Sequence, residues 1–245
     1  MLILFFLVGS MEFYVNGEKT IINKEPFDHG SEGVLYLLED RVYKIYFNNA
    51  LNEGFGNKEK YHKALLGLNG LTSHIILPTN LIFSVTGKYS GYTSPLVGDC
   101  DKNKVGLIKL EWNEIITNIK NIEKDSVFLG NERFYLSDFA FHNMVFSNLE
   151  RKLYVVDPGR YHHVSTFTLP DYKRINKVIV NEAFLNLLRR EIIEFKLITP
   201  GKISLLVRTI KSEIGELAYS DYLELQSSKY KTMSDFVKMK ARYLK

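Results

Sequence analysis

Short apolar runs alternate with polar turns through the first hundred residues of the chain. Runs typical of β-strands occur at residues 13–15, 34–38, 42–47, 75–83 and 89–97. Glycine, asparagine and aspartate separate several of these runs, as expected for tight turns between strands. One segment, at residues 58–68, has the composition of a helix that ends at Gly67 or Gly70. This part of the sequence therefore predicts an antiparallel sheet with one inserted helix.

After Gly98 the spacing of apolar residues changes to three or four positions, which is typical of one face of an amphipathic helix. The first such series comprises Ile108, Trp112, Ile115, Ile119 and Ile122, and a second comprises Ile203, Leu206, Ile210, Ile214 and Leu217. Residues 181–195 and 221–243 also have a helical pattern. We therefore predict an α+β protein of two lobes, with a β-rich lobe at 1–97 and a mainly helical lobe at 98–245.

Composition narrows the class of protein without identifying a function. The 245 residues are 45% hydrophobic and 24% charged, which is ordinary for a globular protein. The single cysteine, Cys100, allows no internal disulfide, so a reducing cytoplasmic setting is the default expectation. The net charge of +4 permits an anionic ligand such as a nucleotide but gives no reason to expect nucleic acid as a partner. Oligomeric state is not predicted.

The two ends of the chain leave several interpretations open. The apolar start is too short to span a bilayer and has no preceding basic residue, so it is a strand, a weak signal or anchor, or a segment upstream of a true start at Met11. We favour a strand or a misassigned start. The basic segment 228–245 fits the polar face of a last helix best, although an acidic partner, RNA or weak membrane association stays open.

Polar residues flank a predicted β-hairpin within residues 136–161. Its strands are 144–146 and 153–156, joined by a polar turn at 147–152. Closing such a hairpin brings Asn143 and Asp157 opposite each other at its open end, with Asp138 five residues upstream of Asn143. Oxygen ligands arranged in this way suit a hard divalent cation. Turn residues with no ligand are the structural alternative.

A second candidate site lies earlier in the chain. Gly30 and Gly33 occupy a turn between strands, where a backbone without Cβ atoms can approach a phosphate. Lys44 lies inside an apolar strand, so its ammonium must reach solvent, form an ion pair or hold an anion. Glu59, on the following helix, is the expected anionic partner of Lys44, and Glu53 is the competing candidate.

The order of these pieces resembles the protein kinase signature: a glycine turn, a strand lysine, a helix glutamate, D-x-x-x-x-N and D-x-G. The last two are Asp138 to Asn143 and Asp157-Pro158-Gly159. The resemblance covers roughly residues 27–161. It is nearer to atypical bacterial-type kinases and to small-molecule kinases such as aminoglycoside, choline and fructosamine kinases than to eukaryotic-type protein kinases.

The resemblance implies a role for each matching residue. Asp138 would accept the proton of, or orient, an attacking hydroxyl group. Asn143 and Asp157 would hold Mg²⁺ on the phosphates of ATP, and Lys44, oriented by Glu59, would hold the α- and β-phosphates.

The resemblance also implies where the adenine would bind. Leu35 and Val42 would form an apolar roof over the base. The segment GYTSPLVGD looks like the hinge between lobes, with Leu96 and Val97 near the base edge.

Several positions depart from the kinase pattern. Asp28 replaces the first loop glycine, Leu136 and Ser137 replace the usual His-Arg pair, Ala140 replaces a lysine and Pro158 replaces the phenylalanine of D-F-G. No A-P-E triplet follows Gly159. The sequence therefore predicts an atypical Mg-ATP phosphotransferase whose hydroxyl acceptor is a small molecule or a protein. The alternatives are a pseudokinase that serves as a nucleotide-binding scaffold, and transfer of AMP from the same site.

Overall fold

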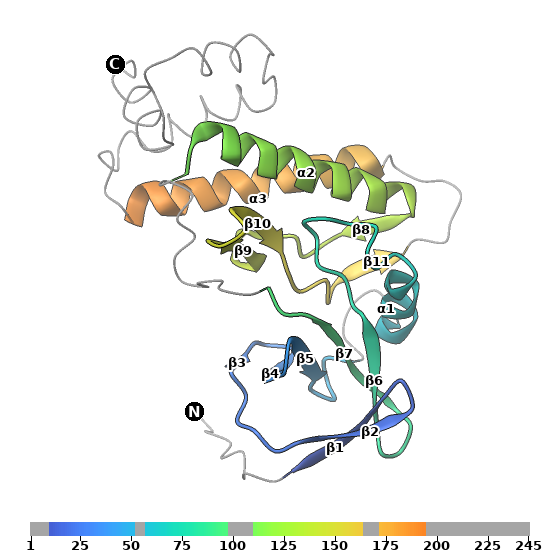
Figure 1. The fold of residues 1–245 in the computed structure, drawn as a ribbon. Coiled ribbons are helices and arrows are strands. Elements are labelled where there is room, and N and C mark those ends of the chain that lie inside the picture. The colour runs from blue at the N-terminus through green and yellow to red at the C-terminus, as the bar shows by residue number, and fades with distance from the viewer. Residues whose placement is uncertain (1–9, 52–56, 98–109, 164–171, 195–245) are drawn as a thin grey trace, which may run out of the picture. The chain divides into compact units, whose positions relative to one another are not determined.

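The computed structural model describes residues 10–51, 57–97, 110–163 and 172–194 (Figure 1). The chain forms two compact units. The first comprises Met1–Thr72, Ile76–Leu96 and Asp157–His163, and the second comprises Ser73–Ile75, Val97–Val156 and Val164–Lys245. The predicted boundary at residue 97 therefore assigns two short segments to the other unit: Ser73–Ile75 belongs to the second unit and Asp157–His163 to the first. The second of these segments matters most for the site. Cys100, Glu53, Ile108 and the predicted helices beyond residue 194 lie outside the described residues.

The first unit is built on a seven-stranded antiparallel sheet with the order β2-β1-β6-β7-β5-β4-β3. Its strands are β1 (Met11–Val15), β2 (Glu18–Ile22), β3 (Asp28–His29), β4 (Gly33–Leu38), β5 (Arg41–Tyr46), β6 (Asn80–Ser84) and β7 (Tyr89–Pro95). Five of them fall within or beside the predicted runs. Strand β6 begins five residues later than the predicted run 75–83, because Ile75 makes only an isolated bridge, to Val155.

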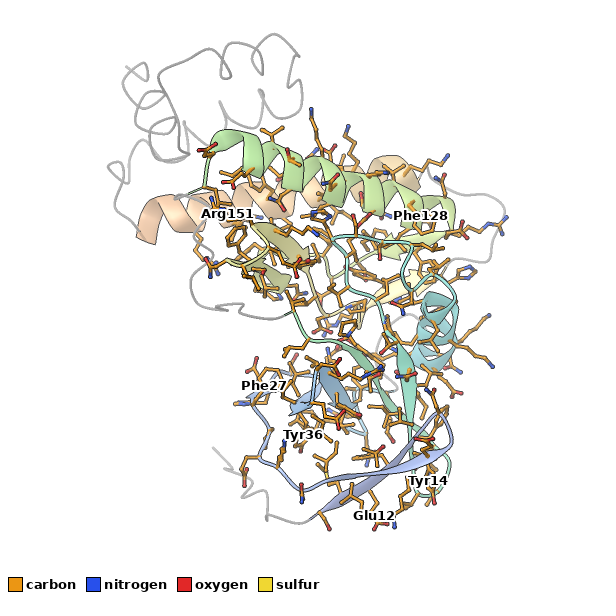
Figure 2. All side chains as sticks on the ribbon, in the orientation of Figure 1. Glu12, Tyr14, Phe27, Tyr36, Phe128 and Arg151 are labelled. Atoms are coloured by element: carbon orange, nitrogen blue, oxygen red, sulfur yellow. The ribbon has the colours of Figure 1, made fainter. Side chains whose placement is uncertain are left out.

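Alternation along β5 sends its side chains into two separate cores. Ile45 joins Phe13, Ile22, Val34, Tyr36 and Ile82 on one face, and Tyr36 is labelled in Figure 2. Tyr46 joins Ala50, Leu81, Tyr89 and Tyr92 on the other. Lys44 has the same parity as Tyr46 and is paired with Leu35 on β4 and Tyr92 on β7. The ammonium of Lys44 therefore belongs to the Tyr46 face.

Helix α1 (Lys58–Leu66) follows the sheet hairpins, close to the predicted span 58–68. The side chain of Asn57 accepts a hydrogen bond from the Lys60 N–H and so caps its first turn. Lys58, His62 and Leu65 are buried, at spacings of four and three residues. This buried face determines which side chains of the helix reach the site.

The second unit contains two long helices, α2 (Trp112–Asn131) and α3 (Tyr172–Glu194), which pack against each other. The predicted apolar positions Ile115, Ile119 and Ile122 are buried on α2. Asn176 on α3 is fully buried, and its amide bonds the backbone of Phe134 and Leu136. None of the helices within the described ranges combines the length and the apolar character needed to cross a bilayer.

The predicted hairpin is present as β9 (Met144–Ser147) paired with β10 (Lys152–Val155). Its register differs by one residue from the prediction. Val155 pairs with Met144, and the Val156 N–H donates to the Asn143 carbonyl at 2.8 Å. Asn143 is therefore opposite Val156, and Asp157 is the next residue along the chain.

Candidate functional site

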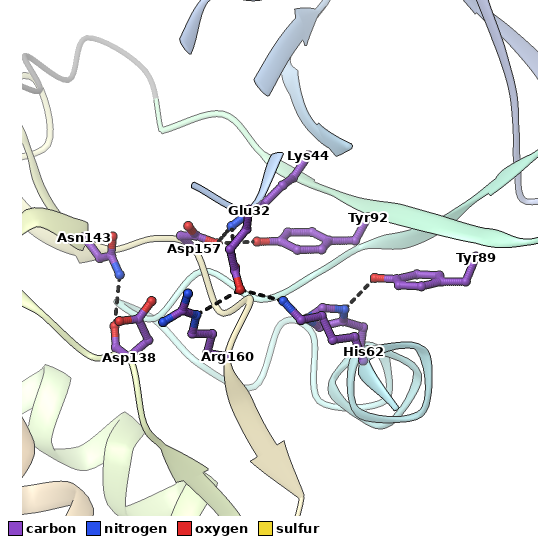
Figure 3. A network of polar contacts seen from close by, with 10 residues as sticks. Glu32, Lys44, His62, Tyr89, Tyr92, Asp138, Asn143, Asp157 and Arg160 are labelled. Carbon is purple, nitrogen blue, oxygen red and sulfur yellow. Dashed lines mark hydrogen bonds and ion pairs between the residues drawn. The ribbon is translucent and has the colours of Figure 1, made fainter. Parts of the chain in front are cut away.

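Lys44 is the centre of a buried charge cluster in the first unit (Figure 3). Its side chain is only 7% exposed, and its Nζ lies 2.5 Å from Asp157 Oδ1 and 3.7 Å from Glu32 Oε2. A buried ammonium is unfavourable without anionic partners, and here it has two. Asp157 lies 113 residues away in sequence, so tertiary folding alone creates the closer ion pair.

Asp157 is held on the same oxygen by a second donor. The Tyr92 hydroxyl donates to Oδ1 at 2.9 Å, from the strand next to β5. Burial raises the pKa of Asp157, but the charge of Lys44 and the hydrogen bonds from Lys44 and Tyr92 outweigh it, so the pKa is lowered. The carboxylate is ionised at neutral pH, and its side chain is still 36% exposed. It is therefore both anchored and accessible.

The D-P-G triplet brings the backbone unusually close to these charges. Asp157 has a φ of 62°, in the left-handed region that Asp tolerates better than most residues. A Cβ atom at Gly159 would lie 2.9 Å from the Tyr46 hydroxyl and 3.0 Å from both Asp157 Oδ1 and Lys44 Nζ. A side chain at this position would therefore have to displace the ends of these side chains, so glycine leaves the ion pair undisturbed.

Glu32, in the glycine turn, is the main anion of the cluster. Its Oε1 accepts hydrogen bonds from Lys58 Nζ at 2.6 Å and Arg160 Nε at 2.9 Å. Glu32 is 8% exposed. Burial raises its pKa, but the hydrogen bonds from Lys58 and Arg160 and the charge of Lys44 outweigh this, so the pKa is lowered. One ionised carboxylate thus joins the glycine turn, β5, α1 and the segment after D-P-G.

The prediction that Glu59 is the anionic partner of Lys44 was wrong. Glu59 forms no ion pair with Lys44 in the described residues; Glu32 and Asp157 take that place. The reason is the rotation of α1, because successive residues differ by about 100° around a helix. Lys58 and His62 share the buried face of α1, whereas Glu59 points beside it and is half-buried. The helix therefore supplies a cation to the cluster, and the glycine turn supplies the anion.

Aromatic rings enclose the cluster on the sheet side. Tyr46 stacks on His62 with an interplanar angle of 4°, and Lys58 Nζ lies 4.5 Å from the centre of the Tyr46 ring. The Nδ1 of His62 is 2.6 Å from the Tyr89 hydroxyl. Burial, followed by the charges of Lys44 and Lys58, lowers the pKa of His62 to about 3. His62 is therefore neutral and adds no charge to the site at pH 7.

Asp138 and Asn143 lie in the second unit, around the short 3₁₀ turn Phe141–Asn143 that precedes β9. The Asn143 Nδ2 donates to the Asp138 backbone carbonyl at 3.0 Å, and Asn143 is buried. Because the nitrogen of the amide is fixed in this way, its oxygen is directed to the opposite side. An amide oxygen oriented in this way is a kind of ligand that Mg²⁺ accepts.

No set of three or more His, Cys, Asp or Glu side chains in the described part of the chain is arranged to hold a metal by itself. Magnesium binding by Asn143 and Asp157 therefore stays a prediction. It would rely on phosphate and water for the remaining ligands, as is usual for this ion.

The predicted adenine-binding residues divide into two groups. Leu35 and Val42 are half-buried and share the sheet face of Lys44, and their role as a roof over adenine stays a prediction. Leu96 is 38% exposed, but its N–H already donates to the Asp40 carbonyl at 2.9 Å. The Leu96 N–H is thus not available to a base edge, and Val97 is the remaining predicted hinge residue.

The two glycines differ in what they permit. A Cβ atom at Gly33 would lie 2.1 Å from the Ile45 carbonyl oxygen, so Gly33 is needed for strand pairing. A Cβ atom added at Gly30 would meet no atom within 4 Å, so close packing does not require glycine there, and the Gly30 N–H donates to the Gly33 carbonyl at 2.9 Å. Phosphate contact at this turn stays a prediction.

Sequence reasoning missed Glu32, Lys58 and Arg160. The available signal was charge balance, since a lysine inside a strand needs an acid and Glu32 lies next to Gly33 at the start of β4. Lys58 and Arg160 carried no such signal, because polar helix starts and loop arginines are common.

Comparisons with known proteins leave the family open. No protein-family model matches the chain, and no curated protein matches it. Among solved structures, the chain is similar to the Cydia pomonella granulovirus kinase PK-1, with a TM-score of 0.44 and 20% sequence identity. The match covers 60% of this chain and 56% of the granulovirus protein. A likeness of this size does not establish a shared fold.

Proposed function

We propose that this chain is a magnesium- and ATP-dependent phosphotransferase of the kinase-like type. The observation that carries the proposal is the ion pair between Lys44 and Asp157, which unites the strand lysine and the D-x-G aspartate of the signature. The order of the glycine turn, the strand lysine, the D-x-x-x-x-N segment and the D-x-G triplet along the chain supports the proposal further. A sheet-based unit and a unit with long helices are what the two lobes of such an enzyme contain.

Each residue has a definite task in this proposal. Lys44 would hold the α- and β-phosphates, with Gly30 offering backbone approach. Asp157 and Asn143 would hold Mg²⁺, which when bound offsets negative charge on the phosphates. Asp138 would orient the acceptor hydroxyl and take its proton as the O–P bond forms and the bond from the γ-phosphorus to the bridging oxygen of ADP breaks.

The acceptor is proposed only as a hydroxyl group of a small molecule or protein. Ala140 removes the lysine that would share charge on the transferred group, so another cation must do this. In the related alternative, the same residues would transfer AMP.

The test uses the full chain with Mg²⁺ and ATP labelled on either the α- or the γ-phosphate, with cell extract fractions as the acceptor source. Transfer of the γ-label supports the proposal, and transfer of the α-label alone supports AMP transfer. Asp138→Asn and Lys44→Met should each reduce transfer by at least about a hundredfold. Lys88→Met, at an exposed turn, is the matched control. Nucleotide binding with no transfer of either label would instead make the chain a nucleotide-binding module.

A further inference from the structure

Glu32 has several cationic partners, but the proposed function gives it no role. Its two oxygens face three cations from three different segments: Lys44, Lys58 and Arg160. Glu32 comes from the turn between β3 and β4, where glycine residues are expected to serve a phosphate. A buried glutamate in such a turn is unexpected, because its negative charge would repel phosphate if it faced the ligand.

The geometry divides the contacts of Glu32 into tight and loose. Lys58 and Arg160 donate to Oε1 at hydrogen-bond distance, whereas Lys44 lies 3.7 Å from Oε2, beyond that distance. An ammonium has three N–H donors, and Asp157 occupies one. Glu32 therefore fixes Lys44 by charge while leaving the ammonium able to donate to another anion.

The backbone of Glu32 is equally fixed. Its carbonyl accepts from the Phe47 N–H at 2.8 Å, immediately after β5, and the Gly30 N–H donates to the Gly33 carbonyl at 2.9 Å. These bonds fix the backbone of Glu32 beside the cations, and the hydrogen bonds from Lys58 and Arg160 hold its carboxylate there.

The buried ammonium of Lys58 requires an anionic partner, and the carboxylate of Glu32 provides it. Lys58 is the first residue of α1, where the helix dipole disfavours a positive charge, and it is buried under the Tyr46 ring. Without Glu32, Lys44 would keep Asp157 as an anionic partner, but Lys58 and Arg160 would lose the carboxylate that they share. Lys44 and Lys58 would then repel each other across the Tyr46 face.

We propose that Glu32 is the positioning residue of the nucleotide site, holding Lys44 for the phosphates and tying the segment after D-P-G to the glycine turn through Arg160. This inference rests on the proposed function, because the phosphates give Lys44 its task. It assigns to the glycine turn the role that sequence reasoning gave to the helix residue Glu59. Glu32 acts through Lys44 and need not touch the nucleotide.

The experiment compares Glu32→Gln and Glu32→Asp with Glu12→Gln, which breaks the exposed pair of Glu12 and Lys19 in the same unit. Affinity for MgATP is measured by calorimetry well below the melting temperature of every variant. Glu32→Gln should weaken binding about tenfold or more, the size expected for losing a charge-assisted contact. Glu32→Asp should recover part of the loss, and Glu12→Gln should bind as the parent does.

A double-variant cycle separates positioning from general stabilisation. In a Lys44→Met background, Glu32→Gln should cause no further loss of affinity, whereas a purely structural defect would add to the first. Unchanged or tighter binding by Glu32→Gln would overturn the proposal, as would a larger loss from Glu59→Gln than from Glu32→Gln.

A second readout needs no nucleotide. Acetylation of individual lysines by a water-soluble reagent is followed by mass spectrometry, with Lys19 and Lys88 as exposed references. Glu32→Gln should raise the rate at Lys44 at least several-fold while the references stay constant. If the parent protein binds no nucleotide, the proposed function fails, and this rate decides whether Glu32 positions Lys44. An unchanged Lys44 rate then overturns the inference.

Discussion

Two buried carboxylates of this protein, Glu32 and Asp125, are satisfied in opposite ways. Glu32 in the first unit faces three side-chain cations. Asp125 on α2 in the second unit is 5% exposed, and its Oδ2 accepts from the backbone N–H groups of Ser73, His74 and Ile75 at 2.6–3.1 Å. Both carboxylates have donors for their oxygens, but only the side-chain cations around Glu32 could also bind another group.

The two carboxylates differ in whether their donors could also bind a ligand. Backbone N–H groups are fixed by the chain, so Asp125 can only pin residues 73–75 to α2. Side-chain cations can keep a carboxylate and still donate to a ligand, because each has several N–H groups. We therefore expect Asp125 to contribute to stability and Glu32 to contribute to the proposed site.

The largest effect on stability should come from Asp125→Ala. Three backbone N–H groups lose their acceptor in a buried setting, so the free energy of unfolding should fall by about 3 kcal/mol or more. Urea denaturation measures this loss, and Asp125→Asn, which keeps one acceptor oxygen, should lose less. MgATP affinity of the folded protein should not change. A loss of affinity as large as that of Glu32→Gln would remove the distinction between the two carboxylates.

An effect of intermediate size is expected on the pH dependence of the free energy of unfolding, to which the buried residues His62 and His74 contribute. The pKa of His62 falls from an ordinary 6.5 to about 3, by burial and then by the charges of Lys44 and Lys58. Burial also lowers the pKa of His74, but the charge of Asp125 opposes this shift. His62 thus contributes stability that is complete above pH 6.5 and is lost as the pH falls toward 3, because only the unfolded chain takes up the proton.

Between pH 7 and pH 5, His62 should account for a loss of about 2 kcal/mol in the free energy of unfolding. Glu32 and Asp157 contribute little in this window, since their ordinary pKa values of 4.5 and 3.8 lie below it. Urea denaturation at several pH values should show a flatter profile for His62→Gln than for His74→Gln. Equal slopes for the two variants would mean that the pKa of His62 is lowered no more than that of His74.

The smallest effect is expected at an exposed ion pair of the second unit. Arg151, labelled in Figure 2, donates two hydrogen bonds to Glu114, but the two side chains are 48% and 29% exposed. Arg151→Gln should change the free energy of unfolding by less than about 1 kcal/mol, and by still less at 1 M salt. Thermal melts at low and high salt would show this. A loss comparable to that of Asp125→Ala would show that exposure is a poor guide to the value of a charge here.

Local sequence patterns were sufficient for most of the elements. The strands around Lys44, helix α1 and the hairpin after Asn143 all follow from apolar period and turn residues, because these depend on near neighbours in the chain. The hairpin register could not be obtained to one residue, since it is set by how β9 and β10 pair and by the turn between them. The return of Asp157–His163 to the first unit carried no local signal.

The sequence by itself determined that a lysine inside a strand must find an anion, and that Asp157 stands in a tight D-P-G turn. Only the tertiary structure decided which acid completes the cluster. Successive residues of a helix differ by about 100° around its axis, so Lys58 and Glu59 cannot both face the cluster. In helix α1 it is Lys58 that is buried, and its partner is Glu32 from the glycine turn. The partner of Lys44 depends on burial and charge balance among segments that are distant in sequence, so local sequence patterns could not predict it.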